Sequence, residues 1–263
     1  MNDPNAKGPT AGPQPGDASP ERGASQAELH PAGMTVVVAT RNRGKLIELR
    51  ELLAGLPIDL RALDDVVPTL PPILEDGATF EENALIKART VAEAALLVTL
   101  ADDSGLEVDA LGGRPGVRSA RFAGDAATDA ENNAALLAAL EEVHGEKRTA
   151  RFRSVIAVVD PFSDAAPLVV EGRCEGSIAR EPRGTGGFGY DPLFVLQEDP
   201  AGPASASPSG RSMAELTEAE KNRVSHRGHA VAQARGYLAD LCAARLRDAR
   251  AIIGEARPAV GTG

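Results

Sequence analysis

The stretch Ala94-Ala-Leu-Leu-Val-Thr-Leu-Ala-Asp-Asp-Ser-Gly105 leads from an apolar run into two carboxylates, a hydroxyl and a glycine. The apolar part predicts a buried strand that ends near Leu100, with Asp102 and Asp103 directly after it. Ligands of α/β sheets bind at such strand ends. A carboxylate pair there can hold Mg2+, which prefers hard oxygen ligands and often binds together with a phosphate. The alternative is an Asp-Ser turn with solvated side chains.

Strands, loops and helices alternate on both sides of this stretch. The β-branched run Met34–Ala39 predicts a first strand, followed by a polar loop and a helix over Leu46–Leu53. Two Thr-x-x-Glu patterns predict capped helices, one from Phe80 to about Leu97 and one from Thr128 to about Val143. The other expected elements are three strands and a long last helix, at 58–63, 149–159, 167–174 and 226–252. This order predicts a mixed α/β fold with a partly antiparallel central sheet flanked by helices.

Composition limits the classes of function. The 263 residues are 43% hydrophobic and 25% charged, which is typical of a globular protein. The formal net charge of −10 argues against nonspecific nucleic-acid binding, which needs a field of Lys and Arg. Cys174 and Cys242 provide neither a disulfide framework nor a zinc cluster, and we expect both to be buried in a reduced cytoplasm. We expect no membrane span and no signal peptide, because no run of about 18 apolar residues exists and the start lacks a basic, then apolar, pattern.

Both ends of the chain differ in composition from the middle. Residues 1–33 are rich in Pro and Gly and predict a disordered tail, because they cannot bury enough apolar surface to offset the ordering entropy. Residues 253–263 predict a shorter flexible tail. The folded domain is therefore expected over residues 34–252, with a Pro/Ser/Ala-rich loop at 197–211.

The loop Thr40-Arg41-Asn42-Arg43-Gly44-Lys45 is a candidate anion site. A loop that leads from a strand into a helix presents free backbone N–H groups, which favour anions. Lys45, in the first helical turn, can reach a phosphate as a point charge. The glycine spacing excludes a Walker A loop. The alternative is a solvated basic loop with an Asn turn.

Two further segments carry charges of both signs. Lys87 lies one turn after Asn83 on the same helix face, although such a pair is usually a solvated face. Glu75 precedes Asp76 and Gly77, a pattern that usually marks only a turn. The functional alternative is that Glu75 completes a metal site with the carboxylates of Asp102 and Asp103.

Two later segments favour a nucleotide. Gly184-Thr-Gly-Gly-Phe-Gly-Tyr-Asp-Pro192 places Phe188 among four glycines, where a ligand can approach the backbone closely. Phe188 could stack on a flat base and Asp191 could accept ring N–H groups, unless Phe188 simply packs inward. In Lys221-Asn-Arg-Val-Ser-His-Arg227, Lys221 can reach a phosphate. Ser225 caps a helix, so that His226 and Arg227 lie in its first turn against the helix dipole.

In this order, the segments resemble the Ham1-type family of non-canonical purine nucleoside triphosphate pyrophosphatases. The resemblance covers roughly residues 34–245, and each segment is weak by itself while the ordered set is specific. Six segments carry it: 39–45, 80–84, 101–109, 112–121, 184–192 and 225–228. It implies two α/β lobes with a nucleotide-binding groove between them. It also implies a cytoplasmic, Mg2+-dependent homodimer that cleaves inosine, deoxyinosine and xanthosine triphosphates between the α and β phosphates.

The resemblance also implies residue roles. The loop from Thr40 to Lys45 would bind the triphosphate, with Thr40, Asn42 and Lys45 as its main contacts and Arg41, Arg43 and Gly44 within it; Lys87 would be a second phosphate ligand. Glu75 and Asp103 would hold Mg2+, with Asp103 taking a proton from the attacking water and Asp102 supporting it. Ser104 would contact the substrate. The nucleotide and base pocket would be formed by Phe188, Gly189, Tyr190, Asp191, Lys221, His226 and Arg227.

The residues themselves support this chemistry and leave two alternatives open. Transfer of a phosphoryl group to water needs charge neutralisation and positioning, which lysines, Mg2+ and a groove would supply. Donors from Arg227 or His226 would pair with a 6-oxo group and oppose a 6-amino group. The alternatives are a pyrophosphatase for other modified or canonical nucleotides and a nucleotide-binding module without catalysis.

Overall fold

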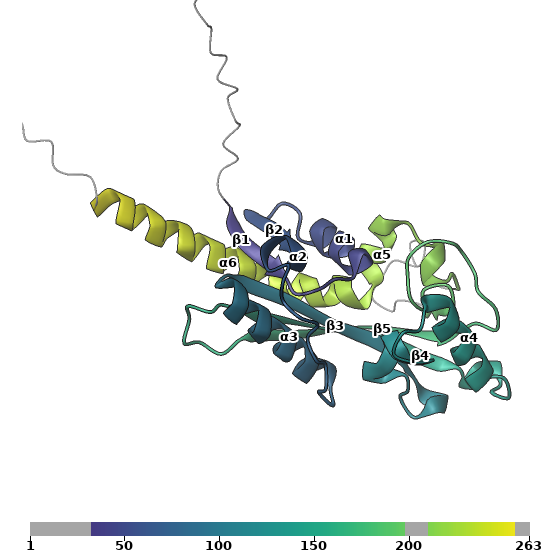
Figure 1. Ribbon diagram of the computed structural model, residues 1–263. Coiled ribbons are helices and arrows are strands. Elements are labelled where there is room, and N and C mark those ends of the chain that lie inside the picture. Colours follow the sequence, from purple (N-terminus) through teal and green to yellow (C-terminus); the bar gives the residue numbers. More distant parts are fainter. Residues whose placement is uncertain (1–32, 198–209, 256–263) are drawn as a thin grey trace, which may run out of the picture. The chain divides into compact units, whose positions relative to one another are not determined.

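The computed structural model describes residues 33–197 and 210–255, and the N-terminal segment 1–32, residues 198–209 and the end of the chain lie outside the described residues. Within these ranges the protein contains a six-stranded sheet and six α-helices (Figure 1). The strands are β1 Met34–Val38, β2 Ile58–Ala62, β3 Val98–Val108, β4 Thr149–Val159, β5 Leu168–Ile178 and β6 Phe194–Leu196. The helices are α1 Arg43–Leu52, α2 Leu63–Val66, α3 Phe80–Ala95, α4 Asp129–Ala139, α5 Glu218–Val224 and α6 His226–Glu255.

The sheet is parallel on one side and antiparallel on the other, which confirms the predicted mixed α/β class. The strand order is β2-β1-β3-β4-β5-β6, with β2, β1 and β3 parallel and the remaining pairs antiparallel. The β1–β3 pairing stops at Val38 and Leu100. Beyond that point β1 turns away into α1, whereas β3 continues along β4. A cleft can therefore open beside β3 at the carboxyl end of β1, where ligands bind in such sheets.

The predicted end of the central strand is wrong. Ala94 and Ala95 still belong to α3, which closes at Leu96 in a left-handed conformation with φ 52°. The strand then starts at Val98 and runs through Asp102 and Asp103 to Val108, paired with β4 over its whole second part. Pairing with β4 extends β3 beyond its apolar residues, and buried cations neutralise the two carboxylates. The pair therefore lies in mid-strand, yet still beside the carboxyl end of β1.

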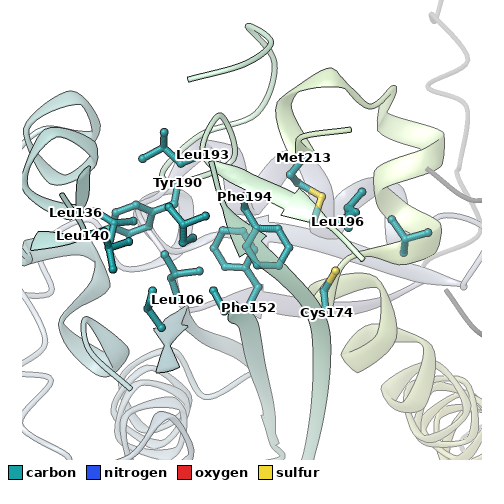
Figure 2. Close-up of a cluster of buried hydrophobic side chains, with 14 residues drawn as sticks. Leu106, Leu136, Leu140, Phe152, Cys174, Tyr190, Leu193, Phe194, Leu196 and Met213 are labelled. Atoms are coloured by element: carbon teal, nitrogen blue, oxygen red, sulfur yellow. The ribbon is translucent and has the colours of Figure 1, made fainter. Parts of the chain in front are cut away.

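Helices cover both faces of the sheet (Figure 1). Leu49 of α1 and Leu238 of α6 pack with Leu100 in one buried cluster, while Val91 of α3 packs with Val155 in another. A third cluster lies under the antiparallel half, where the rings of Phe152 and Phe194 meet at a centroid distance of 4.5 Å (Figure 2). This last cluster supports the floor of the functional site.

Several other predictions are confirmed with shifted ends. Both Thr-x-x-Glu capping boxes are present, at Thr79 and Thr128, and β4 has its predicted bounds. The first helix begins three residues early, and β5 runs on to Ile178. The last helix reaches Glu255, past the predicted start of the C-terminal tail. The sequence analysis did not predict α2, α5 or β6. Along the two described ranges, no helix combines the length and apolarity needed to span a bilayer.

Candidate functional site

The loop between β1 and α1 directs its polar groups toward β3. Asn42 caps α1 by accepting the backbone N–H of Lys45 at 3.1 Å, and Thr40 accepts the N–H of Asn42 at 3.1 Å. The Lys45 ammonium reaches the Asp102 carboxylate at 2.8 Å. Arg41 and Arg43 are exposed; Arg41 is bound to Asp64 at 2.9 Å and lines the same cavity as Asp103. Of the predicted loop, Lys45 is thus the cation that meets the carboxylates.

The two adjacent carboxylates lie on opposite faces of β3, as successive residues of a strand must. Asp102 faces α1 and α6, where it meets Lys45 and Arg227. Asp103 faces α3, where the Lys87 ammonium donates to it at 2.6 Å. Both side chains are buried, so each depends on its own set of cations for neutralisation.

Lys87 bridges two carboxylates on the Asp103 side. Its ammonium is 3.0 Å from a Glu75 oxygen and also donates to the backbone carbonyl of Asp102 at 3.1 Å. Burial raises the pKa of Asp103 to about 6, and the nearby Glu75 charge adds to this, while Lys87 and Lys45 oppose it. Burial also raises the pKa of Glu75, but Lys87 outweighs it and the pKa is lowered overall. Asp103 therefore carries a carboxylate that exchanges a proton near neutral pH.

Two residues that the sequence analysis did not assign hold Glu75 in place. The Asn83 amide of α3 accepts the backbone N–H of Gly77 at 2.9 Å, and Arg121 donates to the backbone carbonyl of Glu75 at 3.0 Å. A Cβ atom on Gly77 would lie 2.7 Å from the Asn83 amide oxygen, so this close approach requires glycine. Asn83 did appear beside Lys87 on one helix face, but no sequence signal showed that it faces a loop.

A chain of buried ion pairs runs on the Asp102 face from the loop before α1 to the glycine-rich loop. Asp102 binds Lys45 and, at 3.0 Å, Arg227 of α6. Arg227 pairs next with Glu48 of α1, and Glu48 pairs with Lys221 of α5 at 2.5 Å. Lys221 finally binds Asp191 at 2.8 Å. The sequence analysis missed Glu48, because a glutamate on the inner side of a short amphipathic helix looks like a surface residue.

These ion pairs stabilise the charged forms of the buried side chains. Burial alone would raise the pKa of Asp102, but the charges of Arg227 and Lys45 hold it well below its usual value. Asp102 also accepts the Ser154 hydroxyl at 2.5 Å and the Ser104 hydroxyl at 3.1 Å. With this many donors around it, Asp102 is suited to orienting cations rather than to taking up a proton. Lys221 is buried against Asp191 and Glu48 and does not line the cavity that contains Glu75, Lys87 and Asp103.

Phe188 forms one wall of a flat pocket. Its ring lies against the backbone of Gly44, where a Cβ atom would be only 2.6 Å from it, and Lys221 lies over the ring at 4.9 Å. Gly189, the buried Tyr190 and Asp191 line the same pocket. From the sequence, Phe188 is expected either to stack on a flat base or to pack into the core. Its position in the structure lies between these two alternatives. The ring is half-buried, with contacts to its own loop and to α1 and with pocket space beside it.

The opposite wall carries two nitrogens without partners. His226 stacks on Phe152 at a centroid distance of 4.7 Å, and its buried Nδ1 has no hydrogen-bond partner among the described residues. Burial and the neighbouring Arg227 charge hold the pKa of His226 well below its usual value, so the ring is neutral at pH 7. The two terminal nitrogens of Arg227 donate to Glu48, Asp102 and Ser104. Its Nε is buried and has no hydrogen-bond partner among the described residues.

Two cavities meet at the loop before α1. One is flat and lined by Phe152, Phe188 and His226, and the other is polar and lined by Glu75, Lys87 and Asp103. Both are lined by a shared set of residues: Asn42, Lys45, Ser104 and Ala120. The two cavities therefore form one cleft, with Asp191, Lys221 and Arg227 at one end and Glu75, Lys87 and Asp103 at the other. Asp102 lies behind it and lines neither cavity.

Comparisons with known proteins agree with this architecture. The model of the Ham1 family matches residues 36–237. The chain is 51% identical over 203 residues to the dITP/XTP pyrophosphatase of Geobacter sulfurreducens, covering 77% of this chain and 96% of that protein. It is also similar to a solved HAM1 protein from Coxiella burnetii, with 45% identity, a TM-score of 0.68 and coverage of 79% and 99% of the two chains. A solved dITP/XTP pyrophosphatase from Mycobacterium abscessus shows 49% identity, a TM-score of 0.58 and coverage of 76% and 98%.

Proposed function

Because the chain belongs to the Ham1 family, we propose that it hydrolyses the triphosphates of inosine, deoxyinosine and xanthosine to the nucleoside monophosphate and pyrophosphate. Two of the similar proteins bear the name dITP/XTP pyrophosphatase. The observation that carries the proposal is the continuous cleft, in which a flat pocket and a polar cavity meet at Lys45. A base in the first and a triphosphate in the second would place a phosphoanhydride beside Asp103.

The polar cavity supplies positive charge for a triphosphate. Lys45 and Arg121 line it together with the helix N-terminus that Asn42 caps. Phosphoryl transfer to water relies mainly on such neutralisation and positioning. Lys87 is proposed as a second phosphate ligand from the family resemblance. Its ammonium pairs with Glu75 and Asp103, as that of Lys45 pairs with Asp102.

The same cavity fits Mg2+. Glu75 and Asp103 both reach the single ammonium of Lys87, so their oxygens can also converge on one cation. Among the residues described, no group of three or more His, Cys, Asp and Glu side chains could hold a metal. A site with two carboxylates suits Mg2+, which commonly completes its octahedron with water and substrate phosphates. When bound, the ion would neutralise phosphate charge and make a nearby water more acidic.

Asp103 is the proposed proton acceptor. A water oxygen bonds to the α phosphorus, the bond from that phosphorus to the bridging oxygen breaks, and pyrophosphate leaves with the bonding electron pair. The water proton passes to the Asp103 carboxylate. Burial raises the pKa of this group to about 6 without the metal, and bound Mg2+ would lower it, so the carboxylate is ionised at pH 7 and can accept the proton. Asp102 supports the step by holding Lys45 and Arg227.

The flat pocket accounts for preference among bases. His226 Nδ1 and Arg227 Nε are buried in its wall without partners in the described chain. An N–H at either position would pair with a 6-oxo group, whereas a 6-amino group would present a second donor to it. A site that leaves buried polar groups unpaired with the wrong substrate can discriminate by roughly 10⁴-fold. Phe188 would stack on the ring of the base.

We extend the proposal to location and assembly. A cytoplasmic site of action is proposed from the family resemblance, and Cys174 and Cys242 are both buried, as expected. The net charge of −10 agrees with a small polyanion held by a local site rather than with a nucleic acid. The homodimer and the two lobes stay predictions from the family resemblance.

The experiment measures pyrophosphate release from inosine triphosphate with Mg2+ by the wild type and Asp103→Asn. We expect turnover by the wild type and a loss of kcat by about 10²- to 10⁴-fold in the variant, because its proton acceptor is gone. No release by the wild type, or full rate in the variant, would refute the proposal. A panel of canonical and modified triphosphates separates this substrate from other nucleotides, and tight binding without turnover would identify a binding module.

A further inference from the structure

Two side chains in the first turns of α4 bind the backbone N–H and the backbone carbonyl of Gly189 in the glycine-rich loop. The N–H of Gly189 donates to the Asp129 carboxylate at 2.7 Å, and its carbonyl accepts from the Asn133 amide at 2.9 Å. Asp129 and Asn133 are four residues apart, so they share one face of α4. No sequence motif links these residues to the loop, which lies about sixty positions later in the chain.

The attachment to α4 adds to a bond at the start of the loop, where the Gly186 N–H donates to the Ala214 carbonyl at 3.1 Å. Residues 184–187 are exposed, and Gly184, Gly187 and Gly189 have positive φ angles of 78°, 73° and 62°. Such a glycine segment has much conformational freedom to lose when it is ordered. On its far side, the hydroxyl of Tyr190 binds the Ser119 carbonyl at 2.9 Å and fixes the loop to the core. Gly189 is therefore the link between this anchored end and Phe188.

The position of Phe188 follows from the position of Gly189. The Phe188 ring is a wall of the flat pocket, and Asp129 and Gly189 line that pocket as well. Without the bonds to Gly189, Phe188 would keep its N–H bond to the Asp191 carboxylate at 3.0 Å and its carbonyl bond from the Asp191 N–H at 3.2 Å. Its ring would keep the contacts with Gly44, Lys221 and Arg227. The tie between this turn and α4 would be gone.

Helix physics suits Asp129 to this task. Asp129 follows the cap residue Thr128 and is the first residue of α4, where the helix dipole stabilises a negative charge. An ionised carboxylate is a strong acceptor for a backbone N–H. From the sequence alone, an Asp at this position is fully explained by helix capping, which is why its second role was not predicted.

We propose that Asp129 and Asn133 are positioning residues that latch the glycine-rich loop and so set the affinity of the flat pocket for the base of the substrate. The proposal rests on the nucleotide chemistry proposed above. It separates two parts of substrate binding: the latch governs recognition of the base and leaves recognition of the phosphates unchanged.

The test compares Asp129→Ala, Asn133→Ala and the double variant with the wild type. The matched control is Asp125→Ala, which removes a carboxylate from the exposed turn before α4, where Asp125 meets only Arg118 at 3.5 Å in the described chain. Calorimetry measures the affinity for inosine monophosphate and, separately, for inorganic tripolyphosphate, which has no base. Steady-state kinetics with inosine triphosphate give KM and kcat.

We expect each single variant to weaken inosine monophosphate binding and raise KM by about tenfold, since a hydrogen bond is worth about one factor of ten. We expect tripolyphosphate affinity to stay within about twofold of the wild type in the same variants, on the same scale of bond energies. Asp129→Asn keeps an acceptor oxygen and should recover most of the loss. The control should match the wild type. Equal weakening of tripolyphosphate, or unchanged inosine monophosphate affinity, would overturn the latch.

Hydrogen exchange of the peptide covering residues 184–188 provides a readout that needs no turnover. The double variant should exchange faster there than the wild type, while the thermal midpoints of the two proteins stay similar. Faster exchange with unchanged base affinity would show a structural tie and refute the positioning role. A wild type that binds inosine monophosphate but releases no pyrophosphate would refute the proposed reaction and leave the latch to be decided by the binding data.

Discussion

The two faces of β3 carry the same side chain in opposite electrostatic settings. Asp102 is surrounded by Lys45, Arg227 and two hydroxyls, and its pKa is held far below the usual value despite burial. Asp103, one residue later, shares Lys87 with Glu75, and burial raises its pKa to about 6. Two cations act on each carboxylate, but Asp102 also accepts two hydroxyls, whereas Asp103 lies beside the charge of Glu75, which raises its pKa further. One carboxylate is therefore a fixed structural charge, and the other is free to exchange a proton.

Removing the fixed charge should have the largest effect on stability. Asp102→Asn would leave Arg227 and Lys45 short of a buried partner, and loss of one member of such a network costs about 3–5 kcal/mol. Urea unfolding at pH 7 measures the free energy of unfolding. If the free energy of unfolding of the variant stayed within about 1 kcal/mol of the wild type, water or Glu48 would be compensating these cations. The contrast between the two faces of β3 would then be refuted.

Glu48 tests the chain of ion pairs on the same face. Glu48→Gln would keep the shape of the side chain but remove the negative charge that Arg227 and Lys221 share. We expect the free energy of unfolding to fall by about 2–3 kcal/mol. Since Arg227 also lines the flat pocket, the ratio of kcat/KM for inosine over adenosine triphosphate should fall. Glu51→Gln is the matched control, because Glu51 is exposed on the same helix and binds only the Asn222 amide among the described contacts. Equal selectivity in both variants would exclude a role for Glu48 in the pocket.

On the other face, a similar substitution should stabilise the protein. The pKa of Asp103 is higher in the folded than in the unfolded chain, so its stabilising contribution is present at low pH and is lost as pH rises through about 6. Asp103→Asn mimics the protonated form and should raise the free energy of unfolding at pH 8, on the order of 2 kcal/mol. Near pH 4 the two proteins should be equally stable. Destabilisation at both pH values would contradict the assignment.

The smallest expected effect is on the pH profile. Protonated Asp103 cannot accept a proton, so kcat/KM should level off above about pH 7 and fall by about tenfold per unit below the pKa of Asp103, which is about 6 without Mg2+ and lower at saturating Mg2+. The depressed pKa of Asp102 acts in the opposite sense on stability, since its contribution is present above its unfolded pKa and is lost only at strongly acid pH. Activity should therefore decline before the protein unfolds. Circular dichroism at each pH checks this order.

Local rules predicted much of this protein. The capping boxes at Thr79 and Thr128, the alternation of β4 and the Asn42 turn into α1 follow from short-range hydrogen bonding and side-chain periodicity, and all are present. The predicted strand end at Leu100 was wrong because strand pairing extends β3. Local hydrophobicity does not report a partner strand fifty residues away.

The residues of the site divide in the same way. The sequence by itself determined which side chains are candidates for the site, because carboxylates, lysines and a glycine-rich loop occur in it in a specific order. Only the tertiary structure decided their states, since strand alternation sent Asp102 and Asp103 to opposite faces and α1, α3 and α6 brought different cations to each. A pKa depends on burial and on charges within a few ångströms, and those distances are set by the packing of segments that are remote in the chain.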